Sequence, residues 1–361
     1  MENVFSKLIV DWYYTHKRDL PWRNTKDPYL IWISEIILQQ TRVQQGMDYW
    51  YRFMRRWPDI ESLARSSEDE VLRMWQGLGY YSRARHLHAA ARQIASMSHF
   101  PDTYGEIRQL KGVGDYTAAA IASFAFGLPV AAVDGNVYRV LSRVFGIITP
   151  INGSEGKKEF AALAQSLLPS GRSADFNQAM MDFGSLQCTP KSPACTMCCM
   201  QELCVAYREN RVGELPVKLH KVKVTRRRLI YFYLRCNGYI AIHQRGEGDI
   251  WQGLWEPYLV ERPVESIEAI ENLDAQDILN NPDNLYGLHH GEKDGVLTLL
   301  ASGVKHVLTH RVLIADFYLW QFAERPSLPQ GFIWIPETDI THYAIPRLVQ
   351  RLLDFLPFGE R

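Results

Sequence analysis

Residues 110–118 read LKGVGDYTA, and this stretch decides how the first half of the chain is interpreted. Gly112 and Gly114 are separated by one residue, so the segment can form a tight turn that leaves backbone N–H groups uncovered at a helix start. Such a turn binds a phosphate without reading the base sequence. Because a Gly-x-Gly also occurs in purely structural turns, its meaning depends on the flanking sequence.

The flanking sequence is helical on both sides. Asp27 followed by Pro28 is a favourable helix start, and the segment from Pro28 to about Gln40 is apolar almost all round, as in a buried helix. Glycine and proline residues interrupt the remaining sequence at intervals, and the segments between them are expected to be helices. These are expected at residues 4–17, 42–57, 68–76, 83–97, 103–109, 115–126, 136–145, 155–168 and 174–184.

A cluster of cysteines follows about seventy residues after the turn. Cys188, Cys195, Cys198 and Cys204 are separated by six, two and five residues, and Cys199 breaks the spacing. Structural zinc sites usually use two short cysteine pairs, whereas iron–sulfur clusters accept varied spacings. We therefore expect a 4Fe–4S cluster on the loop 188–204, with zinc or no metal as the alternatives. Lys191 in this loop is either a phosphate contact or a solvated surface lysine.

The pattern changes beyond the cysteines. Residues 1–209 form the expected helical domain, and residues 210–224 are basic and poorly periodic, as in a linker. Residues 225–361 contain short strands, with Asn237-Gly238 as a hairpin turn, and a closing helix at 346–355. The fold class is thus a mostly α region followed by a smaller α+β domain.

Composition bounds the function only loosely. The 361 residues carry no net charge, but residues 1–224 have 27 basic and 22 acidic side chains, an excess of +5, and the remainder has 13 and 18. That excess helps phosphate binding modestly. The uncharged stretch 116–133 is alanine-rich and is interpreted as a buried helix and turn, not as a membrane span. We expect a cytoplasmic monomer without a membrane partner, nucleoid-associated if bacterial.

Two carboxylates are candidates for chemistry. Glu35 is the only charge in the apolar helix, and an unpaired buried carboxyl has a raised pKa that suits a general acid. The alternative is a structural glutamate paired with an arginine. Asp134, in VDGNVYRV at 133–140, is either a helix N-cap or a catalytic group.

Several motifs together resemble one family. LPWR at 20–23, WISEIILQQT at 32–41 and GLGYYSRA at 77–84, with the hairpin 110–118, Asp134 and the cysteines, are similar to the MutY family of adenine glycosylases. This family belongs to the helix-hairpin-helix, iron–sulfur class of the endonuclease III superfamily. The resemblance covers about residues 15–205. The family usually has proline where Lys111 stands, a change the turn should tolerate.

The resemblance implies roles for individual residues. Glu35 would protonate adenine, and Asp134 would stabilise the developing positive charge or trap it transiently. Tyr116 and Asn136 would support the acid and the attacking water. Endonuclease III-type enzymes carry a lysine nucleophile where Tyr116 stands, so no lysine-mediated strand cleavage is expected. Taken singly, Tyr80 could be a core residue and Arg18 a surface one. The DNA- and base-contacting residues implied by the resemblance in this region are Arg18, Trp22, Arg23, Gln40, Thr41, Leu78, Tyr80, Gly112, Gly114 and Asp182.

The last part resembles the family's Nudix-like domain. WQGLWE at 251–256 matches its Trp-x-Gly-Leu-Trp-Glu, but no Arg-Glu-x-x-Glu-Glu helix follows, so pyrophosphate hydrolysis is not expected. Residues 306–310 occupy the place of the family's Phe-Ser-His segment, or are an ordinary hairpin end. If the segment matches Phe-Ser-His, the residues that would read 8-oxoguanine are Leu308, Thr309 and His310.

The resulting hypothesis is a base-excision repair glycosylase. It would flip adenine out of duplex DNA opposite 8-oxoguanine or guanine and hydrolyse its N-glycosidic bond by general acid catalysis. The rivals are a bifunctional pyrimidine glycosylase/lyase, a catalytically silent DNA clamp and a zinc-binding module.

Overall fold

The computed structural model describes residues 3–219, 224–263 and 295–357. The chain divides into two compact units, each described by itself: one contains Met1–Arg65 and His86–His220, and the other contains Ser66–Arg85 and Lys221–Arg361. Four residues of the expected linker, 220–223, lie outside the described part. So do residues 264–294 of the expected second domain.

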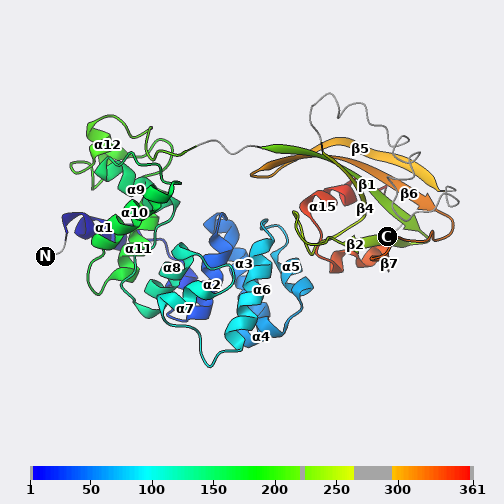
Figure 1. The fold of residues 1–361 in the computed structure, drawn as a ribbon, viewed down its shortest axis with the longest axis horizontal. Helices are drawn as coiled ribbons and strands as arrows, with labels where there is room; N and C mark the ends of the chain where they lie inside the picture. The colour runs from blue at the N-terminus through cyan, green and yellow to red at the C-terminus, as the bar shows by residue number, and fades with distance from the viewer. Residues whose placement is uncertain (1–2, 220–223, 264–294, 358–361) are drawn as a thin grey trace. The chain divides into compact units, whose positions relative to one another are not determined.

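The first unit is built from helices (Figure 1). α6 crosses the boundary between the units at Arg85, and short helical turns complete the cysteine loop. The elements are α1 Val4–His16, η1 Pro21–Arg23, α2 Pro28–Leu38, α3 Val43–Arg56, α4 Ile60–Arg65, α6 Ser82–Ala95, α7 Tyr104–Gln109, α8 Asp115–Phe126, α9 Gly135–Phe145, α10 Ser154–Ser166, α11 Ser173–Asp182, η2 Phe183–Gln187, η3 Cys195–Met197 and α12 Val205–Arg208.

Local chemistry explains where these helices begin and end. Asp27 caps α2 by accepting a hydrogen bond from the Tyr29 N–H, and Pro28 occupies the first position, as the sequence predicts. Four of the five alanines of α8 are buried, and Gly127 ends that helix in the left-handed conformation. Stretch 116–133 is therefore a buried helix and its turn. Within the described residues, no helix has both the length and the apolar content needed to cross a membrane.

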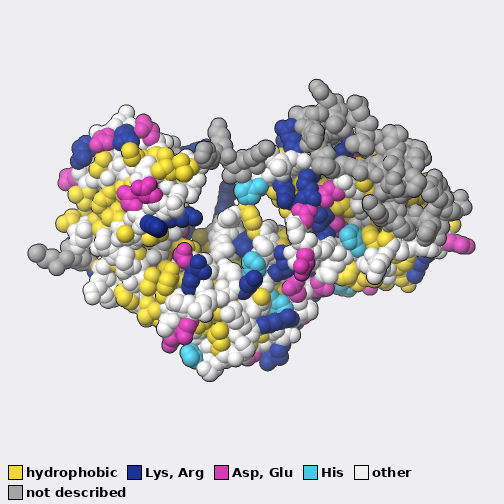
Figure 2. Space-filling view, in the orientation of Figure 1, with side chains coloured by type: hydrophobic (Ala, Val, Ile, Leu, Met, Phe, Trp, Pro, Cys, Tyr) yellow, Lys and Arg dark blue, Asp and Glu magenta, His cyan; other side chains and the backbone are white. Residues whose placement is uncertain are grey.

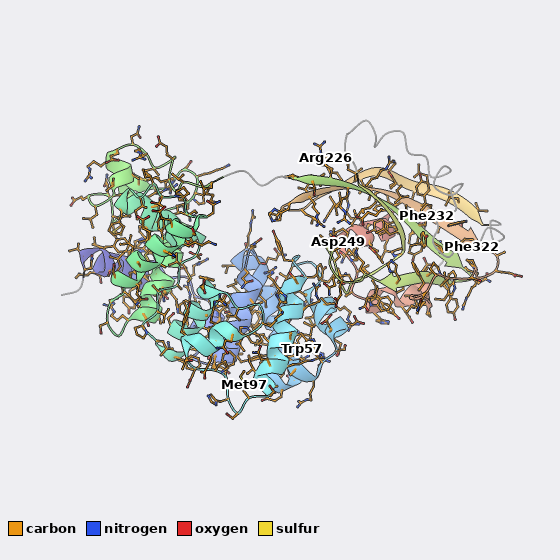
Figure 3. The ribbon with its side chains drawn as sticks, in the orientation of Figure 1. Trp57, Met97, Arg226, Phe232, Asp249 and Phe322 are labelled. Carbon is orange, nitrogen blue, oxygen red and sulfur yellow. The ribbon has the colours of Figure 1, made fainter. Side chains whose placement is uncertain are left out.

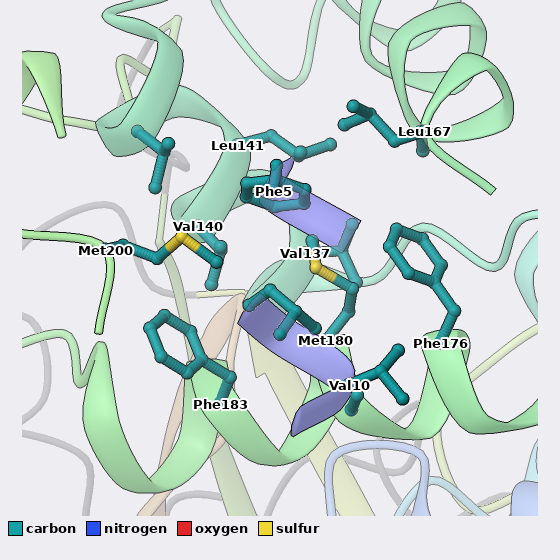
Figure 4. Packing of buried hydrophobic residues seen from close by; sticks show 14 of the residues in the cluster. Phe5, Val10, Val137, Val140, Leu141, Leu167, Phe176, Met180, Phe183 and Met200 are labelled. Atoms are coloured by element: carbon teal, nitrogen blue, oxygen red, sulfur yellow. The ribbon is translucent and has the colours of Figure 1, made fainter. Parts of the chain in front are cut away.

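One core of the first unit joins helices that are far apart in sequence. Phe5 and Val10 of α1 pack with Val140 of α9 and Met180 of α11 (Figure 4). Cys188, Cys198 and Cys204 are partly buried against the same cluster. This core therefore fixes α9, which carries Asp134 at its start, relative to the cysteine loop.

The second unit contains a mixed sheet, with α5 Glu68–Trp75 and the start of α6 assigned to the same unit. The strand order is β3-β2-β1-β6-β5, with β4 paired to β1 and β7 to β2; β1 and β6 run parallel. The closing helix α15 packs through Leu348 against the sheet face that contains Tyr231 and Phe317. The elements are β1 Thr225–Cys236, β2 Tyr239–Gln244, β3 Trp255–Glu256, β4 Tyr258–Pro263, β5 Val296–Val307, β6 Arg311–Phe322, β7 Phe332–Pro336, η5 Glu337–His342 and α15 Arg347–Asp354.

The predicted hairpin turn is present between β1 and β2. Asn237 and Gly238 both have positive φ, 47° and 75°, as a two-residue hairpin turn with the right-handed strand twist requires. Cys236 pairs with Tyr239 across it. The fold class predicted from the sequence, a helical region followed by an α+β domain, is confirmed.

Candidate active site

Glu35 lies on α2 with its side chain withdrawn from solvent; the residue is 7% exposed. The Tyr116 hydroxyl, from the second residue of α8, donates a hydrogen bond of 2.9 Å to Glu35 Oε2. Burial raises the pKa of Glu35 to about 7, and the Asp134 charge adds to this, while the Tyr116 hydrogen bond and Arg23 oppose it. A carboxyl with a pKa near 7 can donate a proton at neutral pH.

Asp134 caps α9, and it also lines a cavity that Glu35 lines. Its Oδ1 accepts the N–H groups of Asn136 and Val137, each at 2.8 Å, and its Oδ2 accepts the Asn136 side-chain amide at 2.7 Å. Burial raises the pKa of Asp134, whereas these hydrogen bonds lower it. The sequence left open a choice between helix cap and catalytic position, and the geometry is compatible with both at once.

A cavity of about 730 Å³ joins these groups. Its volume suits a small organic group such as a nucleobase with its sugar. Of the site residues predicted for the first unit, the lining includes Arg18, Trp22, Arg23, Glu35, Gln40, Thr41, Gly112, Gly114, Tyr116, Asp134 and Asn136.

Asp182 is placed differently from the other predicted base-pocket residues. Its side chain is fully buried and does not line the cavity. Arg23 binds it through two contacts of 2.7 and 2.8 Å, and Arg18 Nε donates at 2.8 Å. Burial raises the pKa of Asp182, but the two arginines outweigh it and hold the pKa below its usual value. Asp182 thus fixes the two arginines that line the cavity.

The glycine turn has the geometry that its sequence predicts. Gly112 has a φ of 77°, and a Cβ there would lie 2.5 Å from the Cβ of His86, so only glycine fits without a shift. Gly114 precedes α8, and no side chain caps that helix. Its first N–H groups therefore remain available for an anion.

The sequence analysis missed Gln178, Met181 and Ser185, which also line the cavity. They recur at helical spacing across α11 and the π-helical turn that follows it. That spacing around Asp182 was the available signal. The Met181 sulfur lies 3.6 Å from the Tyr116 hydroxyl.

Arg139 links the cavity to the cysteine loop. Its Nη2 donates to Asn136 Oδ1 at 2.8 Å and to the Gly184 carbonyl at 2.6 Å, and its Nε donates to the Cys188 carbonyl at 2.8 Å. No isolated signal in the sequence indicates this role, because Arg139 is one of two arginines on α9.

The four cysteines predicted as ligands surround one small cavity. Arg143, Phe183 and Met200 complete much of its wall. Arg143 Nη1 lies 3.4 Å from Cys188 Sγ, and the Met200 N–H points to Cys198 Sγ at the same distance. Cys199 is exposed outside this group, and Lys191 is exposed as well.

The remaining predicted DNA-contacting residues belong to the second unit. Leu78 is buried, whereas Tyr80 is exposed and adopts a positive φ of 45° between Gly79 and the start of α6. Thr309 and His310 are exposed in the turn between β5 and β6, and Leu308 is partly buried. The Tyr80 hydroxyl is hydrogen-bonded to the Thr309 hydroxyl.

Comparisons with known proteins agree with this architecture. Residues 33–169 match the model of the HhH-GPD superfamily of base excision DNA repair proteins, and residues 230–355 match a NUDIX domain. An adenine DNA glycosylase of Buchnera aphidicola subsp. Schizaphis graminum is 30% identical over 354 residues, covering 97% of this chain and 98% of that protein. The chain belongs to the adenine DNA glycosylase family.

Further relatives extend the family across kingdoms. The adenine DNA glycosylase of Mus musculus is 43% identical over 223 residues, which cover 59% of this chain and 43% of the mouse protein. Among solved structures, a thermostable thymine-DNA glycosylase is 34% identical, with a TM-score of 0.54, and covers 57% of this chain and 96% of its own. Like the other members of the adenine DNA glycosylase family, this chain is a DNA glycosylase, a hydrolase of N-glycosyl bonds.

Proposed function

We propose that the chain excises adenine opposite 8-oxoguanine, or opposite guanine, in duplex DNA. The observation that carries the chemistry is the pairing of Glu35 with Tyr116 in a cavity that Asp134 also lines. Glu35 is a buried acid with a pKa of about 7, so a large fraction of it carries a proton at neutral pH.

The reaction follows from these positions. Glu35 donates its proton to adenine, at N7, and the N-glycosidic bond then breaks with its electron pair moving to the base. The Asp134 carboxylate, which accepts three hydrogen bonds, stabilises the positive charge that develops on the sugar. A water molecule adds to the sugar carbon, and its proton is lost to a carboxylate. Asn136 is held on Asp134 and supports the water.

Adenine must leave the base stack to reach Glu35. The family resemblance implies that Gln40 and Tyr80 enter the duplex and fill the gap that the base leaves. Both residues have positive φ values, 57° and 45°. Non-glycine residues in this region are uncommon and concentrate at functional positions. The turn at Gly112 and Gly114 would hold a backbone phosphate of the DNA.

The four cysteines fit a 4Fe–4S cluster better than a single zinc ion. They surround a common cavity, and their separations of six, two and five residues contain only one of the two short cysteine pairs that structural zinc sites usually use. Cys188, Cys195, Cys198 and Cys204 would be the ligands. When bound, the cluster would cross-link the loop and so brace the start of α9. A brown protein with absorbance near 400 nm, lost in Cys204→Ser, would support the cluster, and zinc without colour would refute it.

Tyr116 separates the proposed function from the lyase alternative. Tyrosine cannot form a Schiff base with the sugar, and here its hydroxyl is bound to Glu35. We propose a monofunctional enzyme. Borohydride should trap no covalent protein–DNA product.

The test of the proposed function is single-turnover adenine release from three duplexes. Fast release opposite 8-oxoguanine, slower release opposite guanine and none opposite thymine is the expected order. Intact binding without release from any duplex would favour a silent DNA clamp.

A further inference from the structure

The turn between β5 and β6 carries the residues proposed to read 8-oxoguanine, and the structure fixes the backbone of this turn. The Leu308 N–H donates to the Arg311 carbonyl at 2.8 Å, which closes the turn. Thr225, at the start of the parallel neighbour β1, donates to the His310 carbonyl through its N–H at 3.0 Å and through its hydroxyl at 3.3 Å.

The side chain of Arg311 is the first after the turn, and Asp249 holds it. Asp249 Oδ1 lies 2.6 Å from Arg311 Nη1 and 2.7 Å from Arg227 Nη1. Its Oδ2 lies 3.0 Å from Arg245 Nη2. One carboxylate therefore binds three arginines that come from β1, β6 and the loop after β2. Asp249 and Arg226 are labelled in Figure 3. Figure 2 shows basic and acidic side chains intermixed on this part of the second unit.

The three arginines depend on Asp249 to different degrees. Arg227 also pairs with Glu261, and Arg245 also pairs with Glu256 at 2.8 Å. Among the described residues, Arg311 forms its ion pair with Asp249 alone. Arg311 is one-third exposed, so without Asp249 its long side chain would be free to sample many rotamers. Loss of the Asp249 carboxylate would thus release the arginine beside the turn and leave the other two paired.

We propose that Asp249 is a positioning residue for lesion recognition, which acts by holding Arg311 and so fixing the turn Leu308–His310. This inference rests on the proposed function. A hydrogen bond from Thr309 to the lesion distinguishes 8-oxoguanine from guanine only if the hydroxyl is held in place, because discrimination depends on geometry. Asp249 contributes to the choice between opposite bases and not to bond cleavage.

The test is the ratio of single-turnover adenine release rates opposite 8-oxoguanine and opposite guanine, measured for the full-length protein with its metal centre. In Asp249→Asn we expect this ratio to fall about tenfold, as loss of one well-placed recognition contact does. Arg311→Gln should lower it to a similar extent, and the double variant should be no worse than either single variant. Glu261→Gln, which removes a carboxylate from Arg227 without touching Arg311, should keep the wild-type ratio.

The outcomes separate the two proposals. A wild-type ratio in both Asp249→Asn and Arg311→Gln would overturn the role of Asp249 while leaving the glycosylase intact. An equal fall of both rates, with the ratio unchanged, would show a merely structural role and would also overturn it. If Asp249→Asn does not fold, Arg311→Gln decides the question. A wild-type protein that shows no preference between the two opposite bases would instead contradict the proposed function.

Discussion

The Tyr116 hydroxyl and the Glu35 carboxylate, 81 residues apart in sequence, are joined by a hydrogen bond of 2.9 Å. The helices α2 and α8, whose buried residues are mostly apolar, meet at this contact. Burial raises the pKa of Tyr116 well above its usual value, so the hydroxyl keeps its proton at neutral pH and can donate it to the hydrogen bond. Because Tyr116 donates, it stabilises the ionised form of Glu35 and moderates the rise in its pKa.

The pH dependence of excision should report this contact. If protonated Glu35 is the acid, the single-turnover rate falls as pH rises through about 7. Tyr116→Phe removes a hydrogen bond that lowers the pKa of Glu35, so this fall should move to higher pH. A pH–rate profile of both proteins between pH 5 and 9 measures the shift. Movement to lower pH in Tyr116→Phe would contradict the assignment.

The free energy of unfolding should depend on pH because Glu35 is buried. Its pKa rises from 4.5 to about 7 on folding, so the folded state binds the proton more tightly than the unfolded state. Stability contributed by this group is therefore present below pH 4.5 and is lost as pH rises to 7. Above pH 7, Glu35→Gln should be the more stable protein, by up to about 3 kcal/mol. Chemical denaturation at pH 8 and pH 5 would show a smaller gain at the lower pH.

Arg139 and Arg143, one turn apart on α9, offer a matched pair of variants. Both bind the cysteine loop, Arg139 through the Cys188 carbonyl and Arg143 through the carbonyls of Thr189 and Pro190, but Arg139 also binds Asn136. Arg139→Met should slow excision about tenfold or more, because it frees the amide that holds Asp134. Arg143→Met should mainly lower the retention of the metal centre. Equal excision rates in wild type and Arg139→Met would refute the positioning role.

The glycine turn allows a second matched pair. Gly112→Ala places a Cβ 2.5 Å from His86 at a φ of 77°, so it should lower the free energy of unfolding by about 1–2 kcal/mol or more. Gly114 has an ordinary negative φ, and its added Cβ would meet open space. Gly114→Ala should leave stability nearly unchanged. Thermal denaturation of the two variants compares them directly, and similar losses would show that the turn is not constrained at Gly112.

The sequence predicted most of the helical architecture and the groups around the cavity. Periodicity and capping residues such as Asp27 are local signals, so they placed α2, α8 and α9 within one or two residues. Glu35 could be predicted as a candidate acid because it is the single charge in an apolar helix, and burying a carboxylate costs free energy.

What could not be predicted depends on long-range packing. The strands β3 and β4 follow Trp251–Leu254, where the sequence showed a motif but no alternation. The clamp of Arg18 and Arg23 on Asp182 joins residues about 160 positions apart, and no local pattern indicates it. The same holds for Arg139, whose contacts with Asn136 and Cys188 arise only when α9 packs against the cysteine loop.

The central claim is that Glu35 supplies the proton for adenine excision. The most direct test is single-turnover adenine release from an 8-oxoguanine·adenine duplex by wild type and Glu35→Gln, with binding of the same duplex measured beside it. We expect intact binding by Glu35→Gln and a release rate lower by roughly 10²–10⁴-fold, the usual contribution of a general acid. The variant's glutamine keeps the shape of the side chain but cannot donate this proton. Release at the wild-type rate by Glu35→Gln would contradict the mechanism.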